Sequence, residues 1–456
     1  MDQQPRERED EEDWGKLFVT RACCGAATCR NFAPELLGEV APAHWDAMDG
    51  DVKKHRLNVL PGTYEEGAFT GVLRQPRSKE DLEAARTAVA ACPFHALRLT
   101  APKDRKRMGG MGSPWRAWPR RIDGDVWALG HPSQNNIGAT AYFIEHPSGG
   151  VLVDLPKPSE EIFRFLAEHG GVRWIFLTHR DHTEHHAEFA ARFPGSRRIL
   201  GAADVNLTGN EYRAATGDVE IKLGDSPDPL TLEGAPIPLQ ALPDAEFAVI
   251  PQPGHTPGSL CLLHRGRFLF TGDHLAYSRR LGHMLAHRLQ CWEDWGRQTR
   301  SVRRLVALAE SGHLRFSWVL PGHGEWQRLQ GDGSALATAA QLRRTLFWME
   351  RQASGHVDLR RYIFFTQLRM KPRSKLARAV RALGGEGPGS DNWLLSRATR
   401  PYLPDHDPSK ERTALLRASL MTATALGASI GIAWLATRAL SSAFSAASSA
   451  ALKPST

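Results

Sequence analysis

The stretch that decides the fold is residues 174–186, which reads WIFLTHRDHTEHH. Its first four residues are apolar, and a short apolar run bounded by polar residues is typical of a buried strand. Four histidines and two carboxylates follow within residues 179–186. Ligands usually bind where the strands of an α/β sheet end, and imidazole with carboxylate is the ligand set of Zn²⁺ and of non-haem iron. The stretch therefore predicts a metal centre at the edge of a sheet.

Other acidic and histidine residues stand in the same local setting. His255, Asp273 and His323 each come directly after an apolar, strand-like run, inside a turn rich in Gly or Pro, and Asp154 ends the run at 151–153. Glycine lets the backbone bend sharply, so such a side chain can point back over the strand ends. Together with residues 179–186 they predict one shared site.

The chain from residue 122 alternates predicted strands and helices, which favours an α/β fold. A hairpin is expected over 259–270 around Gly266, and helices are expected over 159–168, 294–310 and 335–349. Residues 102–121 are rich in Gly, Pro and basic residues without periodicity, and this predicts a linker.

Residues 122–350 resemble the metallo-β-lactamase superfamily, the glyoxalase II type more than the lactamases. The matching segments are Val153-Asp154, Thr178-His179, Pro253-Gly254-His255-Thr256-Pro257-Gly258-Ser259, Thr271-Gly272-Asp273 and Pro321-Gly322-His323-Gly324. The resemblance implies a four-layer αββα sandwich over residues 122–355, with metals held between the edges of the two sheets.

The histidine-rich segment departs from the superfamily's usual His-x-His-x-Asp-His run, and two registers are compatible with it. The first uses His179, His182, Glu184 and His185. The second, which we favour, uses His179, Asp181, His185 and His186.

In the second register the resemblance implies one ion on His179, Asp181 and His255. A second ion takes His185, His186 and His323, and Asp273 bridges the two. Asp181 and Asp273 are thereby expected to be catalytic, and Asp154 is expected to orient a ligand from behind. His274, His283 and His287 are expected to be surface histidines or to support a ligand.

Residues 14–101 resemble a ferredoxin, a small α+β fold. The resemblance rests on Cys29-Arg30-Asn31-Phe32-Ala33-Pro34-Glu35, on Arg74-Gln75-Pro76, and on the Ala91-Cys92-Pro93 that closes a helix predicted over 79–91. This fold together with a metallohydrolase in one chain also resembles a family from cyanobacteria and plants.

Ferredoxins hold a [4Fe–4S] cluster with a C-x₂-C-x₂-C run and a distant Cys-Pro. Here Cys23 and Cys29 keep the outer spacing and Cys92 is the distant residue, but Ala26 replaces the middle cysteine. Three interpretations remain: an iron-sulfur cluster completed by Cys24 or by a ligand from outside the chain, a three-iron cluster, or a fold that has lost its iron.

The length of 456 residues predicts more than one domain, and the formal charge of +8 would permit contact with nucleic acid. No nucleic-acid motif is present, so the partner expected is a small-molecule substrate. Neither a secretory signal nor a transit peptide is recognisable in residues 1–13, and the six cysteines cluster as metal or redox groups do. A reducing compartment, chloroplast or cytoplasm, is therefore expected.

The C-terminal part divides into a basic extension, residues 356–412, and an Ala-rich tail, residues 413–456. Residues 418–437 carry no charge and contain Gly427 and Gly431 at a spacing typical of packed membrane helices. They predict a membrane anchor, the alternative being a surface helix.

The sequence thus predicts a hydrolase that uses Zn or Fe to activate water for attack on a small acyl, thioester or related substrate. The alternatives are an iron-dependent redox or sulfur enzyme, and a non-catalytic, membrane-tethered redox or scaffold protein with a vestigial site.

Overall fold

The computed structural model describes residues 14–20, 23, 25–39, 70–100, 118–205, 215–279, 281–287 and 291–351. The chain divides into two units, Met1–His356 and Val357–Thr456, and every described residue belongs to the first. The predicted extension and the predicted membrane tail lie outside the described residues, as do Cys24 and most of the predicted linker. No helix within the described ranges has the length and apolar character needed to cross a membrane.

The first large sheet has seven strands in the order β11-β10-β9-β8-β7-β6-β5. Their bounds are β5 Arg120–Asp123, β6 Val126–Ala128, β7 Tyr142–Ile144, β8 Gly150–Val153, β9 Val172–Phe176, β10 Arg197–Gly201 and β11 Ile221–Leu223. Strands β8 to β11 are parallel, and β5 to β8 are antiparallel. Helices α3 (Glu160–Glu168) and α4 (His186–Arg192) connect the parallel strands, as parallel pairing requires.

The second large sheet has five strands in the order β12-β13-β14-β17-β18. Their bounds are β12 Phe247–Pro251, β13 Leu260–His264, β14 Phe268–Gly272, β17 Trp318–Pro321 and β18 Gln327–Arg328. The predicted hairpin around Gly266 is the β13–β14 pair. Helices α5 (Trp295–Glu310) and α6 (Ala335–Arg351) follow, and a small antiparallel pair joins β15 (Ala276–Ser278) to β16 (His283–Leu285).

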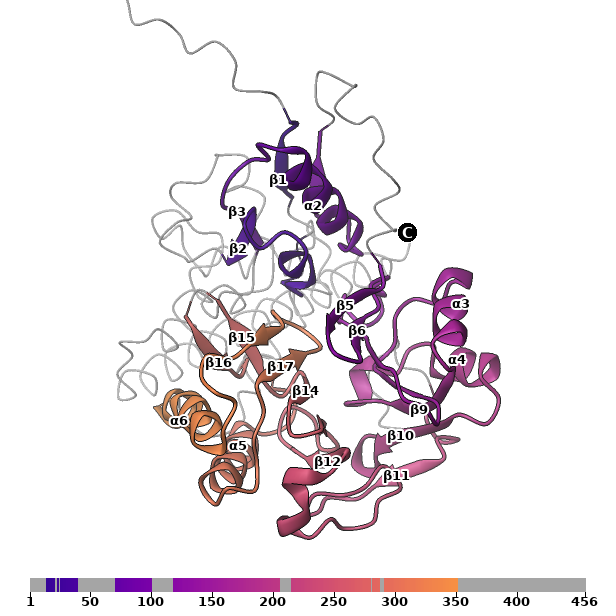
Figure 1. Ribbon diagram of the computed structural model, residues 1–456, viewed down its shortest axis with the longest axis vertical. Helices are drawn as coiled ribbons and strands as arrows, with labels where there is room; N and C mark the ends of the chain where they lie inside the picture. The colour runs from indigo at the N-terminus through magenta and orange to yellow at the C-terminus, as the bar shows by residue number, and fades with distance from the viewer. Residues whose placement is uncertain are drawn as a thin grey trace, which may run out of the picture. The chain divides into compact units, whose positions relative to one another are not determined.

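Side chains that alternate along the central strands divide the core into layers. On β9, Trp174 and Phe176 belong to the cluster between the sheets, whereas Ile175 belongs to the cluster that contains the α3 residues. On β13, Leu262 packs between the sheets, and Leu263 packs with the α5 and α6 residues. Both faces of each sheet are therefore buried, and the layers run helix, sheet, sheet, helix (Figure 1).

The N-terminal part, residues 14–100, is a small α+β arrangement. Strand β1 (Leu17–Val19) pairs with β4 (Leu97–Leu99), and β2 (Leu37–Glu39) pairs with β3 (Thr70–Val72), both antiparallel. Helix α2 (Lys79–Ala90) begins where Ser78 accepts a hydrogen bond from the Asp81 amide, and a 3₁₀ turn, η1, covers Thr28–Asn31. The strand at 17–19 and the helix at 79–90 agree with the sequence pattern.

Three further 3₁₀ turns lie among the loops: η5 (Arg180–His182), η6 (Ala202–Asp204) and η7 (Leu239–Asp244). The first two follow directly on β9 and β10, at the strand ends where the predicted site lies.

Candidate metal centre

Segments that are far apart in the sequence end at the same edge of the two sheets. Residue 179 lies just beyond β9, and residue 255 lies in the loop between β12 and β13. Residues 273 and 323 come directly after β14 and β17, which are parallel neighbours, so their turns lie side by side. The predicted convergence of these turns is observed.

Asp273 is the centre of the group. Its Oδ2 atom lies 3.5 Å from His179 Nε2, 3.6 Å from His182 Nε2, 3.8 Å from His255 Nε2 and 2.8 Å from His323 Nδ1. Four imidazoles from three segments thus surround one carboxylate.

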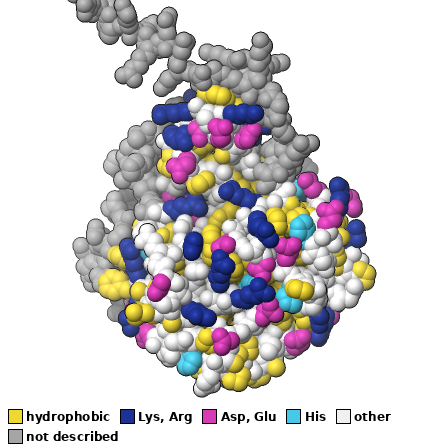
Figure 2. Space-filling view, viewed as in Figure 1, with side chains coloured by type: hydrophobic (Ala, Val, Ile, Leu, Met, Phe, Trp, Pro, Cys, Tyr) yellow, Lys and Arg dark blue, Asp and Glu magenta, His cyan; other side chains and the backbone are white. Residues whose placement is uncertain are grey.

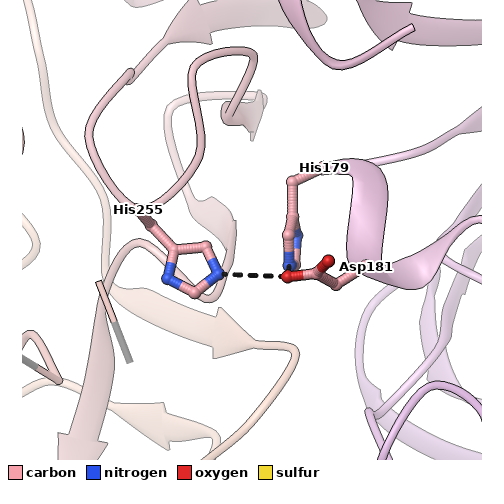
Figure 3. A group of neighbouring side chains, drawn as sticks. All are labelled: His179, Asp181 and His255. Atoms are coloured by element: carbon pink, nitrogen blue, oxygen red, sulfur yellow. Dashed lines mark ion pairs between the residues drawn. The ribbon is translucent and has the colours of Figure 1, made fainter. Parts of the chain in front are cut away.

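Asp181 is a second carboxylate that lies close to the histidines of the group. Its Oδ2 lies 3.7 Å from His179 Nε2 and 3.9 Å from His255 Nε2 (Figure 3). Figure 3 shows His179 and Asp181 on one segment facing His255 on another. Ligand atoms lie within 4.8 Å of one another in two sets, His179–Asp181–His255 and His179–His182–Asp273.

Three histidines have a buried Nε2 atom that forms no hydrogen bond within the described part of the chain. His179, His182 and His255 are almost wholly buried, and their Nε2 atoms have no hydrogen-bond partner within the described part of the chain. Buried polar atoms are nearly always paired, so three Nε2 atoms that converge on one region without a hydrogen bond would suit a further ligand. Two ligand atoms each about 2.1 Å from one ion at a tetrahedral angle stand about 3.4 Å apart. The observed separations of 3.5–3.9 Å are close to this value.

His182 lies in the group, whereas His185 and His186 lie outside it, so the observed placement matches neither sequence register in full. The 3₁₀ turn η5 begins directly after His179 and turns Asp181 and His182 towards the same centre. His185 then adopts a left-handed backbone, with φ of 69°, as the residue before helix α4, and its Nδ1 lies 3.5 Å from Glu188.

His186 is held elsewhere by its own partners. Its Nε2 donates to the Ala215 carbonyl at 2.9 Å, and its Nδ1 lies 3.1 Å from Arg198, which also pairs with Asp218 and Glu220. The site therefore combines Asp181 from the favoured register with His182 from the other.

Asp154 fixes the orientation of His182, in keeping with its expected supporting role. Its Oδ2 accepts a hydrogen bond from His182 Nδ1 at 2.8 Å, and its Oδ1 accepts one from the Thr178 amide at 2.9 Å. In the neutral ring, an Nδ1–H that donates to a carboxylate leaves the Nε2 lone pair to face the centre, as is usual for a metal-binding imidazole.

The electrostatics of the group follow from burial and from its mixed charges. Burial would lower the pKa of His182, but the charges of Asp273 and Asp154 outweigh it and raise the pKa to about 9. Burial, then the charge of His179, lower the pKa of His255 to about 3. Burial opposes ionisation of Asp273, yet the charges of His323 and His182 hold its pKa well below the usual range. An ionised Asp273 thus stands among imidazoles, an arrangement suited to a cation.

Asp204 is a supporting residue that the sequence analysis missed. It is buried, and its carboxylate accepts hydrogen bonds from the Arg180 amide at 2.9 Å, from Thr256 Oγ1 at 2.7 Å and from the Gly258 amide at 2.8 Å. It ties the segment that carries His179 to the loop that carries His255. Its position just after a strand, in η6, was the one available signal.

Gly322 is required by close packing against the group. A Cβ at this position would lie 2.5 Å from Cε1 of His182 and 2.9 Å from Oδ1 of Asp273. The Gly-His-Gly turn therefore brings its backbone up to the centre as well as supplying His323.

The remaining predicted histidines lie outside the group. His274 and His283 are buried and not on the surface; burial lowers the pKa of His274 to about 3, and His283 Nδ1 donates to the Met284 carbonyl. His287 is partly exposed. His274 lies just beyond the end of β14, and His283 is the first residue of β16.

Three of the four predicted cysteine ligands can be placed. Cys23 and Cys29 are buried, Cys92 is partly exposed, and none forms a disulfide. Burial and the nearby Cys23 raise the pKa of Cys29 to about 12, with a smaller contribution from Cys92. Cys29 Sγ also lies 3.4 Å from Thr70 Oγ1. Cys23 and Cys92 thus both act on Cys29, but within the described ranges no three of these sulfur atoms form a group with mutual distances of 4.8 Å or less.

Comparisons with known proteins give a partial likeness. No protein-family model matches the sequence, and no curated protein matches it significantly. A solved structure of DIM-1 metallo-beta-lactamase exposed to ceftazidime shares 15% identity, covering 49% of this chain and 95% of that one, with a TM-score of 0.35. A metallo-beta-lactamase from Pontibacter korlensis shares 17% identity over 49% of this chain and 97% of its own, with a TM-score of 0.34.

Proposed function

We propose that this chain is a metal-dependent hydrolase that activates water for attack on a small acyl or thioester substrate. The observation that supports it most is the convergence of three buried, unpaired Nε2 atoms on the ionised Asp273. A purely structural cluster would satisfy these atoms with hydrogen bonds, because leaving each one unpaired costs about 1–3 kcal/mol.

The proposed ligand sets follow the geometry of the donor atoms. His179, Asp181 and His255 would hold one ion, and His182 and His323 would hold a second, with Asp273 between them. A divalent ion there would act as a Lewis acid and lower the pKa of a water molecule towards roughly 7. Imidazole and carboxylate suit both Zn and Fe, and we retain both.

The chain's own groups prepare this chemistry. Asp154 keeps the proton of His182 on Nδ1, so that the Nε2 lone pair faces the centre. Asp204 joins the segment of His179 to the loop of His255 through hydrogen bonds. Gly322 lets the turn of His323 pack closely against His182. Asp181, partly exposed at the centre, can accept a proton from water as it attacks, which is the catalytic role we assign to it.

Metal analysis and turnover test this proposal together. Purified chain should contain at least about one equivalent of Zn or Fe, and should hydrolyse generic thioesters. His255→Ala and Asp273→Ala should lose both properties. His313→Ala is the matched control, because within the described part of the chain its imidazole has a hydrogen bond to Ser311 alone. A parent chain that contains less than one equivalent of metal after expression in metal-replete medium would overturn the proposal.

A second proposal concerns the N-terminal part, for which we propose a ferredoxin-like fold. Cys23, Cys29 and Cys92 would hold an iron-sulfur cluster there, with Cys24 or an external group as the fourth ligand. Cys23 and Cys29 belong to one buried cluster against which Cys92 packs, and this supports the proposal. Anaerobically purified chain should absorb at about 400 nm, and Cys29→Ser should remove that band. A parent chain that lacks both the band and bound sulfide would overturn it.

A further inference from the structure

A cavity of about 1020 Å³ lies within the unit Met1–His356. One wall is helix α2 and the turns around β4, and the other wall is formed by residues 131–135, residues 157–159 and His185. A hydrogen bond from Gln134 Nε2 to the Pro93 carbonyl, 2.6 Å long, joins the two walls. The volume matches the upper end of small-molecule binding sites.

The permanently charged side chains among the described lining residues are the cations Arg86 and Lys157, and histidines stand beside them. Arg86, His95, His131, Lys157 and His185 line the cavity, and no Asp or Glu is among the described lining residues. By contrast, basic and acidic side chains are interspersed over the face shown in Figure 2. A concave site lined by one sign of charge concentrates the potential and attracts the opposite charge.

The two permanent cations are available to a ligand. Arg86 and Lys157 form no ion pair within the part of the chain that the structure describes. Two of the histidines have carboxylates nearby: Glu161 lies 3.9 Å from His131 and Glu188 lies 3.5 Å from His185. Burial lowers the pKa of His131, Glu161 raises it and Lys157 lowers it, and the net shift is downward. The positive charge that remains uncompensated is therefore mainly that of Arg86 and Lys157.

The rest of the lining is largely apolar. Val89, Leu99 and Pro132 contribute to the walls, together with the partly exposed Cys92. A free inorganic anion would leave such a surface unused, whereas an organic anion with an apolar segment would cover it.

The cavity and the metal centre share chain segments. The loop that contributes residues 131–135 continues to Ile137, whose carbonyl lies 3.3 Å from His323 Nε2. Lys157 follows Asp154 closely in the chain, and its amide donates to the His131 carbonyl. His185 follows His182 in the same way. A ligand in the cavity therefore lies next to the segments that carry the centre.

We propose that this cavity binds the anionic end, phosphate or carboxylate, of the substrate, whose acyl bond then reaches the metal centre. This inference rests on the proposed hydrolase function and narrows its substrate class to organic anions that carry an ester or thioester. Arg86 and Lys157 recognise the charged groups, and the apolar wall accommodates the connecting segment.

Direct binding to the full chain tests the cavity without catalysis. Coenzyme A, which carries phosphates, and glutathione, which carries carboxylates, are the two probes for isothermal titration calorimetry. The double variant Arg86→Gln with Lys157→Gln should weaken binding of the preferred probe by about tenfold or more. The matched control, Lys79→Gln with Arg164→Gln, removes two exposed cations from α2 and α3 outside the cavity and should bind like the parent. Binding of neither probe by the parent, or equal binding by the parent and the cavity variant, would overturn the inference.

Turnover separates this inference from the proposed function. The cavity variant should lower kcat/KM for acyl-coenzyme A or acyl-glutathione by about tenfold while leaving a neutral thioester unchanged. Suppose that neither the parent nor any variant hydrolyses a thioester, but the cavity variant still binds the probe more weakly than the parent. The hydrolase proposal then fails and the cavity assignment stands. If a neutral thioester is hydrolysed as fast as the anionic ones by parent and variant, the cavity assignment fails and the hydrolase stands.

Discussion

Replacing Asp204 by Ala tests the scaffold of the site in the most direct way. The carboxylate of Asp204 accepts three hydrogen bonds from the two loops on either side of it. Asp204 is 1% exposed, so water has little access to replace it. The substitution removes one negative charge and all three acceptor contacts at once.

The loss in the free energy of unfolding depends on what each of the three donors does without Asp204. The Thr256 hydroxyl keeps a neighbour in Ser259 Oγ, 2.8 Å away, and loses little. The amides of Arg180 and Gly258 lose the acceptor that the structure gives them, and each buried unpaired amide costs about 1–3 kcal/mol. We therefore expect a loss of about 2–6 kcal/mol in the free energy of unfolding. We also expect metal affinity to fall about 10–100-fold, because the segments that carry His179 and His255 are no longer tied together.

Urea denaturation followed by tryptophan fluorescence, with metal titration of the folded variant, measures both effects. Asp244→Ala is the control, since Asp244 is exposed at the end of η7 and should change the free energy of unfolding by no more than about 0.5 kcal/mol. If Asp204→Ala unfolds within about 1 kcal/mol of the parent and binds metal equally well, the reasoning that this carboxylate holds the two loops is refuted.

Three further predictions test the histidine segment and its surroundings. His182→Ala should lose bound metal whereas His186→Ala should retain it, as elemental analysis of both variants will show; equal loss would restore the register based on His186. Gly322→Ala should also lose metal, because the new methyl group would lie 2.5 Å from the His182 ring, whereas Gly224→Ala, with no atom within 4 Å, should not; metal retained in the first variant would contradict this packing. The paired guanidinium lowers the pKa of Glu220 from 4.5 to about 2, so its stabilising effect is complete above pH 4.5 and is lost as the pH falls towards 2. Glu220→Gln should therefore cost roughly 1 kcal/mol or less at pH 7, a value reduced by solvent screening, and the difference in urea midpoint should shrink in acid; a difference independent of pH would contradict it.

The sequence predicts the large sheets well because their strands carry long apolar runs. The apolar residues at 174–177 and the hairpin at 259–270 leave little choice but buried strands, and both are observed. Strands β15, β16 and β18 were not predicted, since two or three residues hold no periodicity. Their pairing is set by neighbours distant in sequence, which a local pattern cannot encode.

The site was predictable where a single residue in a turn carries the chemistry. His255, Asp273 and His323 each directly follow a glycine in a short turn, and each is the residue of its turn that faces the centre. Residues 182, 185 and 186 offer three imidazoles within one short segment. The choice among them depends on the 3₁₀ turn and on Arg198, which engages His186 from the next strand. Neither feature has a signature in the segment itself.

The N-terminal part takes part in holding this site, which separate domains joined by a linker would not require. The side-chain amide of Asn31 donates to the Gly324 carbonyl at 3.2 Å, and its oxygen accepts from the Trp326 amide at 3.1 Å. The Gly324 amide in turn donates to the Ala26 carbonyl at 3.0 Å. The turn that carries His323 is therefore bonded on one side to the strand ends and on the other to the loop between Cys23 and Cys29. Because a buried loop must place its backbone hydrogen bonds somewhere, removing residues 14–100 would expose these groups and loosen His323. The geometry of the metal centre is thus a property of both parts of the chain together.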